Sequence, residues 1–157
     1  MAAHVFNVKH GGLIRWSGKI AAAETTAWNK GRVLTLSSVD GGLTLHAGAS
    51  GTIAMIALEN RALSTSVGPT STLTVVGAPT GEKKSVIVDK AVIVTSEVAS
   101  GSSWNPGDKV YVSSTGYIAD GDRARYNTNS VVIGFALDQG RAGDDGNPLE
   151  FYFDVSY

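Results

Sequence analysis

Alternation of apolar and polar residues is clearest near the end of the chain, where every second residue from Leu149 to Val155 is apolar. The residues between them fall on the opposite side of an extended segment. A period of two is typical of a strand with one buried face. Residues 52–58 are instead nearly all apolar, which indicates a strand buried on both faces.

Short strands separated by turns account for most of the remaining pattern. The clearest of them cover residues 32–37, 43–46, 86–88 and 91–94. Asp40-Gly41-Gly42 is a turn signal of the kind that joins hairpin strands. Only residues 19–27 have a helix-favouring composition, and that stretch is too short for more than one helical turn. The pattern therefore predicts a protein that is almost entirely β.

Two stretches of the chain resemble each other. One begins Trp28-Asn29-Lys30-Gly31 and the other Trp104-Asn105-Pro106-Gly107, and each continues into a strand that ends in Ser-Ser. A glycine-led strand follows in both, beginning at Gly42 and Gly116, and then an apolar strand that ends in an acid–amide pair. These features predict a duplicated three-strand unit. The alternative is chance similarity, because strand sequences of low diversity resemble each other easily.

Two segments carry apolar residues with no evident partner in this pattern. Residues 1–18 are predicted to form an N-terminal arm, which Gly11-Gly12 separates from a β-barrel domain at residues 19–157. Residues 64–84 are predicted to form a projecting flap with a short strand inside it. Unpartnered apolar residues usually mark an interface. The residues predicted to bind a partner are Val5, Phe6, Val8, Trp16, Leu73 and Val75. For the arm, an ordinary first strand of the domain is the alternative.

A total of about ten strands predicts an all-β fold, either a single compact β-barrel or a two-sheet sandwich. The duplicated three-strand unit, the flap and the arm are parts of that prediction. The 157 residues suffice for one domain, and a hydrophobic content of 43% argues against disorder. The chain has no cysteine, which excludes disulfides and cysteine-ligated metal sites.

Charge and hydropathy exclude several classes of partner. A net charge of −1 gives no excess of positive charge for non-specific binding to nucleic acid. No apolar run approaches the ~18 residues of a membrane span, so no membrane association is expected. The first ten residues lack the basic and apolar regions of a secretory signal, so synthesis in a cytoplasm is expected.

The search for catalytic chemistry returns few candidates. No glycine-rich phosphate-binding loop is present, and the aspartates at 120–122 and 144–145 lack the spacing of a calcium loop. His46 falls on the polar side of a strand, where an exposed histidine is expected rather than a base or a ligand. The aromatic residues stand mainly at strand positions that favour core packing. We therefore expect no catalytic, cofactor-binding or metal-binding residues, and no enzyme activity.

The order of these phrases resembles a known group of proteins. The phrase from Trp104 to Tyr111, with Gly116 and the strand Val132-Ile133-Gly134-Phe135-Ala136, is similar to the small β-barrel capsid decoration (cement) proteins of tailed bacteriophages. The likeness covers residues 28–155, and the arm and the flap depart from it. It implies a structural protein on the outer capsid surface of a virion, made in the cytoplasm of a bacterial host. It also implies the major capsid protein as partner and assembly with itself as a homotrimer, without cofactors.

Two other functions remain open from the sequence. One is a carbohydrate-binding or receptor-binding β module of a phage particle, which predicts aromatic side chains exposed together on one face. The other is a small hydrolase whose site no motif reveals, which predicts a pocket with a strongly shifted carboxylate or histidine pKa.

Overall fold

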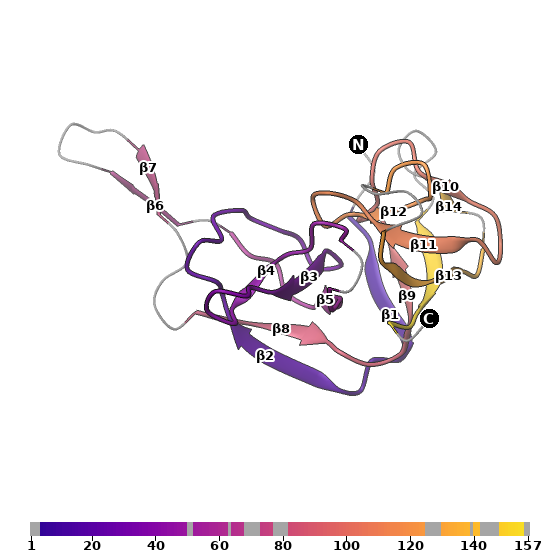
Figure 1. Cartoon of the computed structure of the whole chain (residues 1–157), viewed down its shortest axis with the longest axis horizontal. Coiled ribbons are helices and arrows are strands. Elements are labelled where there is room, and N and C mark those ends of the chain that lie inside the picture. The colour runs from indigo at the N-terminus through magenta and orange to yellow at the C-terminus, as the bar shows by residue number, and fades with distance from the viewer. Residues whose placement is uncertain are drawn as a thin grey trace.

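A computed structural model describes residues 4–49, 52–62, 64–67, 73–76, 82–124, 130–138, 140–141 and 148–155. These residues form fifteen β-strands and no helix, so the all-β prediction is confirmed. Most of the strands belong to two antiparallel sheets of six and five strands, neither of them closed, as in a two-sheet sandwich (Figure 1). The short stretch at residues 19–27 contains a turn and no helix.

The two large sheets are built from strands of both halves of the chain. The first sheet consists, in spatial order, of β1 (Phe6–Gly11), β9 (Ala91–Thr95), β15 (Leu149–Phe153), β13 (Val132–Ala136), β11 (Lys109–Val112) and β12 (Ile118–Ala119). The second consists of β2 (Arg15–Lys19), β8 (Lys83–Ile87), β5 (Met55–Ala57), β3 (Val33–Leu36) and β4 (Leu43–Leu45). Two small ribbons complete the fold, β6 (Ser64–Val67) with β7 (Leu73–Val76) and β10 (Ser103–Trp104) with β14 (Gly140–Arg141).

The duplication predicted from the sequence is larger in the structure than three strands. Five strands of the second sheet lie in the spatial order β4-β3-β5-β8-β2. Five strands of the first sheet lie in the spatial order β12-β11-β13-β15-β9. Numbered along the chain within each set, both have the same order, third-second-fourth-fifth-first. We call the first set the first repeat and the second set the second repeat. β1 is an additional strand on the edge of the second repeat, and the β6–β7 ribbon is an insertion in the first.

Hydrogen bonds match between the repeats residue by residue. Gly31 N donates to Ala57 O at 2.7 Å, and Gly107 N donates to Ala136 O at 2.7 Å. The two glycines have φ of 97° and 91°, a conformation that favours glycine and explains why Trp-Asn-x-Gly occurs twice. The sequence comparison matched Gly42 with Gly116, and this match is wrong. Ser37 N donates to Gly42 O, and the equivalent Ser113 N donates to Tyr117 O. Gly42 therefore corresponds to Tyr117 and not to Gly116.

The chain passes between the two sheets twice, at adjacent places. Gly11-Gly12 connects β1 to β2, and Asp89-Lys90 connects β8 to β9. Gly12 N donates to Lys90 O at 2.9 Å, and a Cβ on Gly11 would lie 2.3 Å from the same oxygen. Gly11-Gly12 thus allows the β1–β2 connection to contact the β8–β9 connection. The sequence pattern had placed these glycines at the boundary of an arm.

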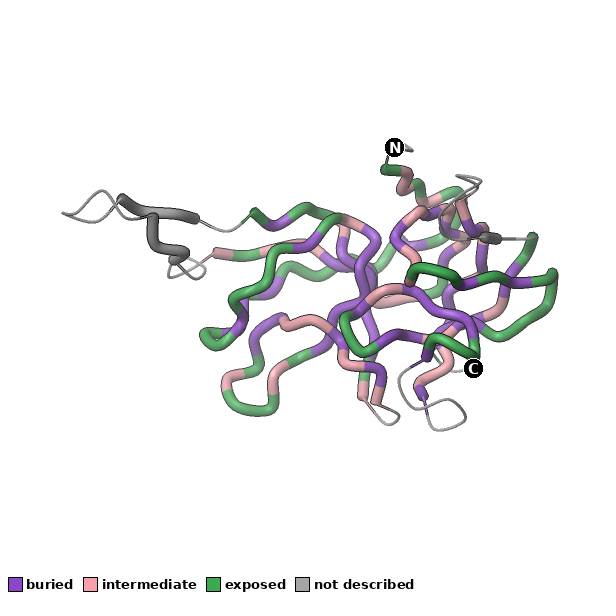
Figure 2. The backbone as a smooth tube through the Cα atoms, turned by 90° about the horizontal axis from the view of Figure 1, so that it is seen from above, coloured by how far each residue is buried: buried purple, intermediate pink, exposed green. Residues whose placement is uncertain are grey.

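The core has two parts. The smaller one lies inside the first repeat and includes Trp28, Leu34 and Val86. The larger part fills the second repeat. It also includes Val33, Ile56 and Ile87, which are fully buried on the face of the first repeat opposite to the smaller core. Buried stretches of both repeats meet in the middle of the molecule (Figure 2). β5 is therefore buried on both faces, as the run at residues 52–58 predicts.

Candidate binding surfaces

The structure places two of the predicted partner-binding residues against the chain's own core. β1 pairs with β9 in an antiparallel register, Phe6 opposite Thr95 and Val8 opposite Ile93. Phe6 and Val8 are half-buried and pack on the larger core, and Val5 is half-buried beside them. The prediction that these apolar residues lack a partner within the chain is therefore wrong for Phe6 and Val8. The alternative, an ordinary first strand, describes β1.

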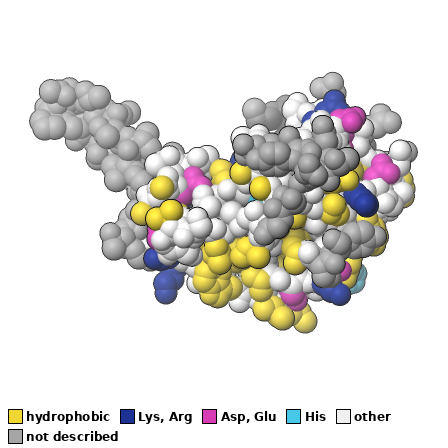
Figure 3. All heavy atoms as spheres, in the orientation of Figure 1, with side chains coloured by type: hydrophobic (Ala, Val, Ile, Leu, Met, Phe, Trp, Pro, Cys, Tyr) yellow, Lys and Arg dark blue, Asp and Glu magenta, His cyan; other side chains and the backbone are white. Residues whose placement is uncertain are grey.

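Trp16 is the member of that set that remains widely exposed, at 43%. It lies on β2, which ends the second sheet, and its ring covers Gly18, where a Cβ would come within 2.4 Å of it. Leu13 and Ile14, in the segment that leads into β2, are exposed as well, and Val88 N donates to Ile14 O at 3.1 Å. Apolar side chains gather over β2, along the lower edge of the molecule in the view of Figure 3.

The predicted flap contains two paired strands rather than one. β6 and β7 form a hairpin in which Ser64 is opposite Val76, and β8 already begins at Lys83. Figure 1 shows this hairpin projecting away from both sheets, and in the described chain it pairs with no other strand. Leu73 and Val75 lie on β7, but their side chains are outside the described residues.

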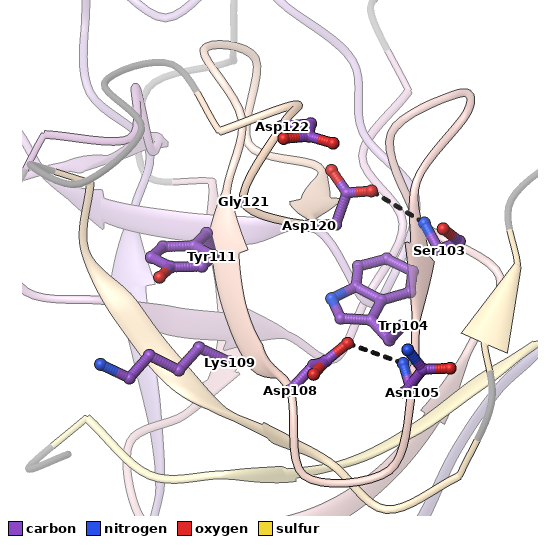
Figure 4. A pocket seen from close by; sticks show the side chains of 9 residues that line it. All are labelled: Ser103, Trp104, Asn105, Asp108, Lys109, Tyr111, Asp120, Gly121 and Asp122. Carbon is purple, nitrogen blue, oxygen red and sulfur yellow. Dashed lines mark hydrogen bonds between the residues drawn. The ribbon is translucent and has the colours of Figure 1, made fainter.

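A polar cavity of about 440 Å³ opens beside the second repeat (Figure 4). Trp104 of β10 and Tyr111 of β11 line it, together with three aspartates at 108, 120 and 122. Asp120 accepts hydrogen bonds from Ser103 N and Arg123 N, both at 2.9 Å. Asp108 accepts one from Asn105 N at 2.8 Å. These two carboxylates thus hold turns in place.

A buried ion pair joins the two repeats. Arg32 Nε of the first lies 3.4 Å from Glu97 Oε1 of the second, with both side chains nearly inaccessible. The Arg32 guanidinium also donates to Thr115 O at 3.0 Å and lies 3.6 Å above the Tyr117 ring. His4 Nε2 lies 3.6 Å from the other oxygen of Glu97, which ties the start of the chain to the same cluster.

A second buried arginine supports the first repeat alone. Arg61 is 2% exposed and donates to Thr26 O at 2.7 Å and to Glu24 O at 3.0 Å, with its guanidinium over the Trp28 ring. The Glu24 carboxylate accepts from Thr44 Oγ1 and from Leu45 N. Burial alone would raise the pKa of Glu24, but these hydrogen bonds outweigh it and lower the pKa below its usual value.

His46 is fully buried, so the prediction of an exposed strand histidine is wrong. Its Nδ1 accepts a hydrogen bond from Gly48 N at 2.8 Å. Burial lowers the pKa of His46, which favours the neutral ring that this bond requires. No described element brings a nucleophile or a second titrating side chain into hydrogen-bond contact with this imidazole. His46 therefore has a structural part in the turn after β4.

Sequence reasoning missed the two buried arginines and the buried histidine. Nothing in the local pattern distinguishes Arg32 or Arg61 from a surface arginine, because their partners are carbonyls and a glutamate distant in sequence. In the described parts of the chain, no three acidic or histidine side chains gather as metal ligands. No helix there is long and apolar enough to cross a membrane. Neither a protein-family model nor a curated protein sequence matches this chain.

Proposed function

We propose that this protein binds the outer surface of a phage capsid as a structural decoration protein and stabilises the shell. The resemblance of residues 28–155 to small capsid cement proteins suggests this role. The protein's partner is then the major capsid protein, and its location is the outside of the virion.

The observation that carries the proposal is the projecting β6–β7 hairpin. A two-stranded hairpin is marginally stable in isolation, because it has no sheet or helix to pack against. This hairpin pairs with no other described strand and is inserted in one repeat only, so the repeat fold does not require it. We therefore assign this hairpin the contact with the shell.

The remaining features are consistent with a binding protein. Asp108 and Asp120 accept backbone hydrogen bonds, and His46 is sealed in the interior. A structural role on a shell needs no acid–base pair, so these groups can serve the fold alone. The thirteen described strands outside the hairpin supply a stable body for it.

Shell binding is tested by shortening the hairpin without disturbing its base. Ser64 and Val76 are register partners, so residues 65–75 can be replaced by Asn-Gly, which forms a two-residue hairpin turn. We expect an unchanged melting temperature and a loss of protein from shells that are mixed with the variant. The matched control replaces Val39 in the β3–β4 turn, 93% exposed, with serine and should retain full occupancy. Full occupancy by the shortened variant would contradict the proposal.

A carbohydrate-binding role is the second candidate, and the cavity between Trp104 and Tyr111 favours it. An aromatic ring beside carboxylates is suited to a sugar, since the ring stacks on its apolar face and the oxygens accept from its hydroxyls. Glycan binding that is lost in Tyr111→Ala, while shells stay bare, would support this role instead.

A further inference from the structure

β1 covers the edge of β9, whereas the matching edge of β2 is open. Ala57 and Ala136 are equivalent, since each accepts a hydrogen bond from the glycine of its Trp-Asn-x-Gly turn. The registers lead from Ala57 through β8 to Trp16, and from Ala136 through β15 to Ile93. Trp16 therefore corresponds to Ile93, and β2 corresponds to β9. No strand of the described chain pairs with the side of β2 that faces away from β8 (Figure 1).

Backbone groups on that side of β2 point outward, where a further strand could bond them. Ile14 O and Ile20 N, at the two ends of the strand, bond the β8 side at 3.1 and 3.2 Å. Along an antiparallel strand the amide and carbonyl groups of successive residues alternate in direction. Those of Arg15, Ser17 and Lys19 therefore point away from β8. We call these three residues the open edge of β2.

The second repeat shows how a strand occupies this position. Ser96 corresponds to Lys19, since each lies three residues after the matched pair, and Ser96 N donates to Val5 O at 2.9 Å. Phe6 and Val8, at alternate positions of the same strand, pack on the larger core. A strand with alternate apolar residues, held by main-chain hydrogen bonds, therefore completes the sheet at this edge.

Apolar side chains beside the open edge are exposed in the first repeat. Ile93 has Val8 as its register partner and is fully buried. Trp16, at the matching place, is 43% exposed, and Leu13 and Ile14 before it are 86% and 61% exposed. An added strand with the alternation of β1 would place its apolar side chains over Trp16. The exposure of these residues thus matches the absence of that strand.

Charge on the other face of the strand selects the occupant. Lys19 is opposite Lys83 in the register, both are exposed, and Arg15 lies on the same face. Asp40 attracts Lys19, but its carboxylate already accepts two backbone hydrogen bonds. Like charges opposite each other on paired strands are destabilising, and opposite charges are favourable. A second copy of β2, paired about Ser17, would place Arg15 opposite Lys19, so an acidic strand fits this edge better than a second copy.

We propose that the open edge of β2 binds an extended acidic segment of a partner protein, which adds to the second sheet as a further antiparallel strand. Its alternate apolar side chains cover Trp16, and its acidic side chains lie opposite Arg15 and Lys19. The inference does not rest on capsid binding by the β6–β7 hairpin. The variant shortened at residues 65–75 should bind the segment as the wild type does, so either proposal can fail alone.

The probe is a synthetic peptide with the sequence of residues 4–11 and the changes Val5→Glu and His10→Glu. By the matched registers these two positions come opposite Lys19 and Arg15. We call it the glutamate peptide. A control, the lysine peptide, has lysine at the same two positions and should bind about tenfold more weakly, because each charge pair then becomes repulsive.

Trp16 reports the binding by its fluorescence. Trp28 and Trp104 are 2% and 3% exposed, and the peptides contain no tryptophan, so a change in solvent exposure comes from Trp16. We expect its emission to move to shorter wavelength as the glutamate peptide is added to the full chain. Quenching by acrylamide should fall along the same titration.

A matched pair of variants tests the main-chain hydrogen bonds. Ser17→Pro removes the N–H that points outward, whereas Ser17→Ala keeps it, and both lose the contact of Ser17 Oγ with Ser85 Oγ. The proline variant should lose peptide binding, and the alanine variant should retain it. A glutamate peptide that is N-methylated at Asn7, the position opposite Ser17, tests the same pairing on the wild-type chain and should not bind.

Charge reversal completes the test. The double variant Arg15→Glu with Lys19→Glu should prefer the lysine peptide to the glutamate peptide. Unchanged Trp16 emission at millimolar glutamate peptide would overturn the proposal, as would equal binding of the two peptides or binding of the N-methylated one. Burial of Trp16 that grows with protein concentration in the absence of peptide would assign the edge to a second copy, and would overturn it as well.

Discussion

Removal of β1 tests whether the first residues belong to the folded body. Phe6 and Val8 are half-buried on the larger core. Complete burial of such a side chain contributes about 1.5–3 kcal/mol, so half-burial of the two contributes about 2 kcal/mol in total. The ion pair of Lys9 with Glu150, 2.7 Å long and partly exposed, adds at most about 1 kcal/mol.

Deletion of residues 2–10 should therefore lower the free energy of unfolding by about 2–3 kcal/mol. At about 2–4 °C per kcal/mol for a chain of this size, the melting temperature should fall by roughly 4–12 °C. The truncated chain should stay folded, since domains are stable by about 5–15 kcal/mol. Urea titration followed by circular dichroism measures the change.

The point variants of β1 separate packing from other effects. Phe6→Ala should account for about 1 kcal/mol of the loss, because it removes the larger of the two packed side chains. Asn7→Ala, at an exposed position of the same strand, should change stability by less than about 0.5 kcal/mol. Unchanged stability of the truncated chain would refute the reasoning, and would restore the hypothesis that these residues form an arm for a partner.

Three further variants test the repeat contact and the buried polar groups. Ile56→Ala should cost about 2–5 kcal/mol by calorimetry, because it leaves a cavity between the repeats, whereas Ile53→Ala at an exposed site should cost far less; equal losses would contradict the assigned contact. Because the pKa of Glu24 is lowered in the folded state, the ionised carboxylate stabilises the fold above the unfolded-state pKa of about 4.5, and this stabilisation is lost as the pH falls through the folded-state pKa. Glu24→Gln should therefore make stability depend less on pH in the acid range. An unchanged dependence would exclude that role. Because the pKa of His46 is lowered in the folded state, the unfolded chain binds a proton more readily, and stability falls as the pH drops below about 6.5. His46→Asn should remove this pH dependence, measured by urea titrations at pH 5 and 7. If the dependence is undiminished in the variant, another group causes it.

The repeat was predictable from sequence where local geometry demands particular residues. Gly31 and Gly107 have positive φ, so the turn before the first strand of each unit retains the same signature. The outer strands of the repeats, β2 with β9 and β8 with β15, share their registers but no sequence likeness. The side chains of β2 are mostly exposed, whereas those of β9 are mostly buried or half-buried. The duplication of all five strands is therefore visible only in the strand order and the hydrogen-bond pattern.

The buried polar groups and the place of β1 were not predictable for a related reason. Phe6 and Thr95 are register partners far apart in the chain, and Gly11-Gly12 has the same local appearance in a crossing as in a hinge. Arg61 is buried because the carbonyl groups of Glu24 and Thr26 converge on it. Residue type favours the surface for an arginine, and only tertiary contacts reverse that preference.

Electron microscopy of phage particles from the source of this chain, prepared with and without the protein, tests the proposed function most directly. The protein should appear as added density on the outside of the shell, two β units in size, with the β6–β7 hairpin directed toward the major capsid protein. Particles without it should lack that density and break at lower temperature. Bare shells in the presence of excess folded protein would contradict the assignment.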